Sequence, residues 1–79
     1  MQQLYIAYVL NIASGDADTT PPHNADACEN LLNEFVYQCT GESKTLVVRQ
    51  YMEHAKGDTQ FTLETGDDIF VFGIVRASK

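Results

Sequence analysis

The sequence predicts a small α+β domain in which one helix packs on a four-stranded, mainly antiparallel sheet, in the order β-α-β-β-β. A chain of 79 residues has room for a single domain, and its 44% hydrophobic content excludes disorder as the main state. Four segments are rich in β-branched and aromatic residues, and one segment after the first of them has helical periodicity. Short turn sequences separate the last three β segments, which favours an antiparallel meander.

Residues 3–13 form the first predicted strand, because they are almost entirely apolar, β-branched or aromatic. Strand alternation puts Leu4, Ile6, Tyr8, Leu10 and Ile12 on one face and Tyr5, Ala7, Val9 and Asn11 on the other. The last predicted strand, residues 69–77, is equally apolar on both faces. We therefore expect these two strands to pair near the centre of the sheet.

Residues 14–24 read as a loop, since Gly, Pro, Asp and Thr dominate them. Asp16 and Asp18 lie in this loop, but the further oxygen ligands and the distal Glu of a calcium loop are missing, so we expect no metal.

Residues 26–39 follow with helical periodicity. Asp26 with Glu29 resembles a capping box, Asn24 is an alternative N-cap, and Gly41 is a natural C-terminal stop. The apolar stripe of this helix consists of Cys28, Leu31, Leu32, Phe35, Val36 and Cys39.

Cys28 and Cys39 lie about 16 Å apart along such a helix, which is too far for a disulfide between them. Free thiols suit a reducing compartment, and no apolar run approaches the roughly 18 residues of a membrane span. No basic residue precedes the apolar start, so a signal peptide is not expected either. These observations predict a cytoplasmic protein.

The rest of the chain is predicted to be a strand at 44–54, a turn at 55–59, a strand at 60–65, a turn at 66–68 and the last strand. In the strand at 60–65, Phe61 and Leu63 are expected to point inward. One helix leaves the other face of the sheet uncovered, which indicates a homodimer or a docked partner. The apolar side chains expected there are drawn from Tyr5, Val9, Val47, Tyr51, Val71 and Val75.

The acidic residues are unevenly distributed along the chain. The net charge is −6, and the first 43 residues contain six acidic side chains without a lysine or arginine, whereas the remainder contains five of each sign. Such a surface repels nucleic acid and attracts basic protein surfaces. The alternative is that the charge serves solubility alone. Because no nucleophile–base motif accompanies His23 or His54, we expect neither an enzyme nor a bound cofactor.

We therefore predict a protein-binding module whose acidic loop and helix occupy a basic groove on a partner. The predicted helix from Asp26 to Glu34 spans about 12 Å, over which duplex DNA carries roughly seven charges. Such a segment suits a local contact site better than a long channel. The candidate contact residues are Asp16, Asp18, Asp26, Glu29, Asn30, Asn33, Glu34 and Tyr37. The alternative is a dimeric adaptor module that uses the sheet face, with Tyr5, Val47, Tyr51 and Val71 in its interface.

In size, in its acidic helix from Asp26 to Glu34 and in its predicted element order, the chain resembles the small phage-encoded anti-CRISPR proteins. The resemblance covers the whole chain, but that class shares no motif, so it assigns no functional residue. It implies non-enzymatic binding to a Cas protein or surveillance complex in the host cytoplasm. The surface bound would be the one that contacts target DNA or the PAM.

Overall fold

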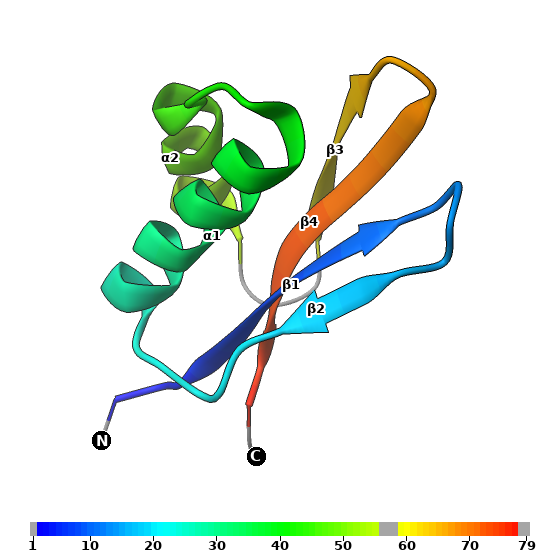
Figure 1. The fold of residues 1–79 in the computed structure, drawn as a ribbon. Coiled ribbons are helices and arrows are strands. Elements are labelled where there is room, and N and C mark those ends of the chain that lie inside the picture. Colours follow the sequence, from blue (N-terminus) through cyan, green and yellow to red (C-terminus); the bar gives the residue numbers. More distant parts are fainter. Residues whose placement is uncertain (1, 56–58, 78–79) are drawn as a thin grey trace.

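The computed structural model describes residues 2–55 and 59–77 and shows two helices on one side of a four-stranded antiparallel sheet (Figure 1). The α+β class is confirmed. The strand order is β2-β1-β4-β3, so the first and last strands pair at the centre as predicted. In chain order the elements are β1 (Tyr5–Asn11), β2 (Ala17–Thr19), α1 (Ala25–Thr40), α2 (Thr45–His54), β3 (Gln60–Thr65) and β4 (Asp68–Arg76).

The strand predicted at 44–54 is wrong, because this segment forms the helix α2. Val48, Tyr51, Met52 and Ala55 recur at helical spacing and pack against the core. Tertiary packing of this stripe outweighs the β propensity of the neighbouring valine and threonine residues. The predicted turn at 55–59 falls mostly on 56–58, which lie outside the described residues.

The second difference is the short strand β2, which forms within the predicted loop and pairs with β1. The turn between them depends on Asn11, whose side-chain Oδ1 accepts hydrogen bonds from the backbone N–H groups of Ala13 at 3.0 Å and Ser14 at 3.4 Å. Gly15 adopts a left-handed φ of 83° and donates its N–H to the carbonyl of Asn11. These local bonds fix where β2 begins.

Helix α1 begins and ends close to its predicted limits. Of the two predicted caps, Asn24 is the N-cap, and its Oδ1 accepts the N–H of Ala27 at 2.9 Å. Gly41 ends the helix as predicted, with a φ of 76° and its N–H donated to the carbonyl of Tyr37.

The core lies between the two helices and one face of the sheet. The fully buried α1 residues Cys28, Leu32 and Val36 meet Phe72 and Ile74 of β4. In β3, Phe61 and Leu63 pack against this core and their neighbours are exposed, which confirms the predicted alternation. The β1 residues on the covered face are Tyr5, Ala7 and Val9.

No helix or strand of the described residues covers the other side of the sheet, here called the uncovered face (Figure 1). Val71 and Val75 lie on it as predicted, but Tyr5 and Val9 lie beneath the helices. Alternation separates the two faces of a strand but does not show which face the helices cover. For β1, the prediction assigned the wrong face as uncovered. The large apolar side chains of the uncovered face are Ile6, Tyr8, Leu10, Ile12, Ile69, Val71 and Val75.

Candidate functional site

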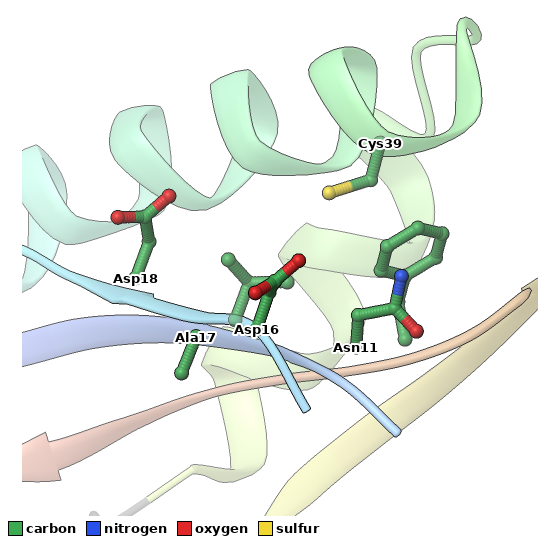
Figure 2. Close-up of a pocket in the computed structure, with 7 residues that line it drawn as sticks. Asn11, Asp16, Ala17, Asp18 and Cys39 are labelled. Atoms are coloured by element: carbon green, nitrogen blue, oxygen red, sulfur yellow. The ribbon is translucent and has the colours of Figure 1, made fainter. Parts of the chain in front are cut away.

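A small pocket opens between β2, the end of β1 and the C-terminal part of α1 (Figure 2). Asp16 and Asp18 point toward α1, and the thiol of Cys39 points from α1 into the same space (Figure 2). We call this hollow of about 190 Å³ the acidic pocket. Its lining residues are Val9, Asn11, Asp16, Ala17, Asp18, Cys39 and Phe70.

The strand pairing of β1 with β2 positions both carboxylates. Asp18 is the direct partner of Val9 in the antiparallel ladder, and Asp16 accepts the N–H of Asn11 on its backbone carbonyl at 2.8 Å. Residues two apart in a strand share a face, so both side chains lie on the helix-covered side. Ser14 Oγ donates to Asp16 Oδ2 at 3.1 Å, which holds that carboxylate in place.

The charged side chains that line the pocket in the described chain, Asp16 and Asp18, are both negative. Neither Asp16 nor Asp18 forms an ion pair with any residue that the structure describes. Cys39 lies in the last turn of α1, which contains no basic side chain to offset the negative end of the helix dipole. Burial and, secondarily, the charge of Asp18 raise the pKa of the Cys39 thiol above its ordinary value of 9.0. The group that such a pocket stabilises is a cation.

The floor of the pocket is apolar, since the buried side chains of Val9 and Phe70 line it. Its volume of about 190 Å³ is below the roughly 300–1,000 Å³ of typical small-molecule sites, and it matches a single inserted side chain better. Lysine and arginine have an apolar stem and a charged end, which suit this floor and these carboxylates.

A second hollow, of about 280 Å³, lies on the outer side of α1. It brings together Asn33, Glu34 and Tyr37, three of the predicted contact residues. Tyr37 is 58% exposed, so its ring is free to contact a partner. Asn30 is exposed on the same helix. This group extends the predicted contact surface along α1.

Asp26 and Glu29 lie apart from the acidic pocket, beside α2, in a hollow that Arg49 and Glu53 also line. Glu29 Oε2 lies 3.5 Å from Nε of Arg49, so part of its charge is compensated. This pair was not predicted, because Arg49 was expected on a strand and lies on α2 instead. We therefore leave Asp26 and Glu29 out of the candidate site.

The alternative interface residues do not form one surface. Tyr5 lies on the covered face, and Val71 lies on the uncovered face. Val47 and Tyr51 are both on α2, where Val47 is 37% exposed and Tyr51 packs against the core. The uncovered face of the sheet therefore has a different composition from the predicted interface.

Comparisons of the chain with protein-family models, with curated proteins and with solved structures find no match. Within residues 2–55 and 59–77, no group of three or more His, Cys, Asp or Glu side chains is arranged to hold a metal ion. Neither helix in this part of the chain is long and apolar enough to cross a membrane. The site is therefore interpreted from its own geometry.

The acidic pocket also includes residues that were not predicted as site residues, among them Asn11, Cys39 and Phe70. Alternation does place Asn11 on the same strand face as Val9, which is a usable signal. The approach of Cys39 and Phe70 depends on how α1 crosses the sheet, and the sequence pattern does not determine that crossing.

Proposed function

We propose that the protein is a non-enzymatic inhibitor that binds a partner protein through the acidic pocket, with the outer side of α1 as a second contact. The observation that supports this most is the pair of carboxylates at Asp16 and Asp18, which have no cationic partner in the described chain and lie above an apolar floor. A lysine or arginine of the partner would place its stem on Val9 and Phe70 and its charge between the carboxylates.

The class of partner follows from the charge and from the size of the surface. A basic surface that normally contacts nucleic acid carries lysine and arginine side chains directed at phosphates. The acidic pocket and Glu34 together present three carboxylates, which can replace only a few phosphates. A local contact site, such as the surface that reads a PAM, suits this number. The resemblance to anti-CRISPR proteins makes a Cas surveillance complex the first partner to examine.

The test is competition for target DNA on a reconstituted Cas surveillance complex with a basic PAM-contact site. We expect the wild-type chain to reduce DNA binding and the Asp16→Lys/Asp18→Lys variant to lose this effect. The matched control is Asp26→Lys/Glu53→Lys, which makes the same change of charge in the first turn of α1 and on α2, apart from the pocket and from the uncovered face. Equal loss of inhibition in the control would show that net charge, and not the pocket, is responsible. Failure of the wild-type chain to compete would contradict the proposed partner class.

A further inference from the structure

The uncovered face exposes several large apolar side chains, and an exposed apolar patch often marks an interaction site. Leu10, Ile12, Ile69 and Val75 are 36%, 55%, 37% and 40% exposed, respectively. The backbone N–H of Ile12 donates to the carbonyl of Ile69 at 2.9 Å, so the patch continues beyond the end of β1. Leu10, Ile69 and Val75 come from the two central strands, and Ile12 follows the end of β1.

Tyr8 flattens the middle of this face. It pairs with Gly73 across β1 and β4, and its ring lies where a side chain at Gly73 would stand. A Cβ at position 73 would approach Tyr8 Oη to 2.6 Å, so glycine is what allows the ring to lie across the strand. Tyr8 Oη also donates to Gln60 Oε1 at 3.3 Å. A flat apolar face suits sheet-on-sheet packing.

The distribution of charge indicates which molecule binds the uncovered face. In the strands that the structure describes, Glu64 is the one charged residue that alternation directs to the uncovered face. The chain as a whole has a net charge of −6. Repulsion between two copies is weaker at this nearly neutral face than at the acidic helix side. A strongly charged partner would find almost nothing complementary there.

We infer that the uncovered face binds a second copy of this chain, with the two sheets packed face to face. Strands of about seven residues and four strands side by side give a face of roughly 23 by 19 Å. Two such faces bury at most about 900 Å² in total, which is below the roughly 1,200–2,000 Å² of stable specific interfaces and typical of weak, transient ones, so the dimer is reversible. A two-fold arrangement pairs the same patch on both copies.

This inference goes beyond the proposed function and does not depend on it. Both helices lie on the opposite side of the sheet from the uncovered face (Figure 1). The dimer therefore leaves both acidic pockets accessible, directed away from each other. A partner with two basic sites would be bound by both copies at once, with a gain from effective concentration.

The test is sedimentation velocity of the wild-type chain over a broad concentration range, without any partner. We expect a monomer–dimer equilibrium that Leu10→Glu and Ile12→Glu each weaken by about tenfold or more, because each copy then buries a charge. The matched control is Leu46→Glu, which changes a side chain that is 73% exposed on α2. We expect this control to dimerise like the wild-type chain.

Circular dichroism establishes that each variant is folded. If Leu10→Glu does not fold, Ile12→Glu decides the question, since Ile12 follows the last residue of β1. A wild-type chain that is monomeric throughout would overturn the inference. So would face variants that dimerise like the wild-type chain, or a Leu46→Glu control that dissociates to the same extent.

Discussion

Asp18 on β2 and Cys39 on α1 both line the acidic pocket (Figure 2). Burial is the larger cause of the raised pKa of Cys39, and the negative charge of Asp18 adds to it. The thiol is therefore neutral at physiological pH and adds no negative charge to the pocket. The reactivity of Cys39 reports directly on the charge in the pocket.

Removing the charge of Asp18 should make Cys39 more reactive. A raised pKa lowers the thiolate fraction at a given pH, so Asp18→Asn should lower the pKa of Cys39 and speed its alkylation a few-fold near pH 8. The measurement is the pH dependence of iodoacetamide modification, followed by mass spectrometry of the peptide that contains Cys39. Asp26→Asn, near the other end of α1, is the control. An unchanged midpoint in Asp18→Asn, or an equal shift in the control, would contradict the proposed proximity.

At the residue scale, the sequence was sufficient to single out Asp16 and Asp18 by their charge, but not to show what surrounds them. Their alignment on one face requires β2, which has only three residues and lies within a run of Asp, Thr and Pro. Glu29 carries the same type of charge, yet its pairing with Arg49 removes it from the site. The residue type predicts which interactions a side chain can make. Its contacts within the chain decide whether it is available to a binding partner.

Helix α2 is the element that sequence reasoning assigned incorrectly. Its apolar residues Val48, Tyr51, Met52 and Ala55 have helical spacing, which was a readable signal. Thr45, with the valines that follow it, favours a strand by propensity alone. The packing of α2 against α1 and the sheet decides the outcome, because a strand would bury these four residues on two different faces.

Tyr51 of α2 also completes the edge of the sheet. Gln60 and Gly73 form the last pair of β3 with β4, and the next N–H, that of Ile74, donates to Tyr51 Oη at 2.9 Å. The same hydroxyl donates to the carbonyl of Thr59 at 2.6 Å. The hydroxyl thus replaces a strand partner and ties α2 to the start of β3.

Tyr51→Phe should lower the free energy of unfolding by about 1–3 kcal/mol, because it removes the acceptor of a buried backbone N–H. Ile74 is 1% exposed, so water cannot readily replace that acceptor. The measurement is urea or thermal unfolding of the purified chain. The control is Tyr37→Phe, at a tyrosine that is 58% exposed, where we expect a change within about 0.5 kcal/mol. Equal stabilities of Tyr51→Phe and the wild-type chain would show that the hydroxyl does not support the sheet edge.

The whole molecule has two layers and two different surfaces. The helix side contains the acidic pocket and the hollow with Glu34, and the sheet side is apolar with one charged strand residue in the described chain. Composition and periodicity were sufficient to predict the α+β class and the central pairing of β1 with β4. They could not show which face of β1 is covered, because both faces are apolar.

The two surfaces should respond to salt in opposite directions. Binding of a basic partner at the acidic pocket should weaken as ionic strength rises, since screening reduces the attraction between opposite charges. Dimerisation through the uncovered face should strengthen, since the same screening reduces repulsion between two copies of net charge −6. The direction of the salt effect therefore shows which surface a given association uses.

The central claim is that the acidic pocket binds cationic side chains of a partner. Its most direct test is fluorescence anisotropy of a labelled arginine-rich peptide, titrated with the wild-type chain, Asp16→Asn/Asp18→Asn, and the matched control Asp26→Asn/Glu53→Gln. We predict that the pocket variant binds the peptide about tenfold more weakly than the wild-type chain, a loss of about 1.4 kcal/mol, while the control binds almost normally. Equal weakening of both variants, or no binding by the wild-type chain at low salt, would contradict the account.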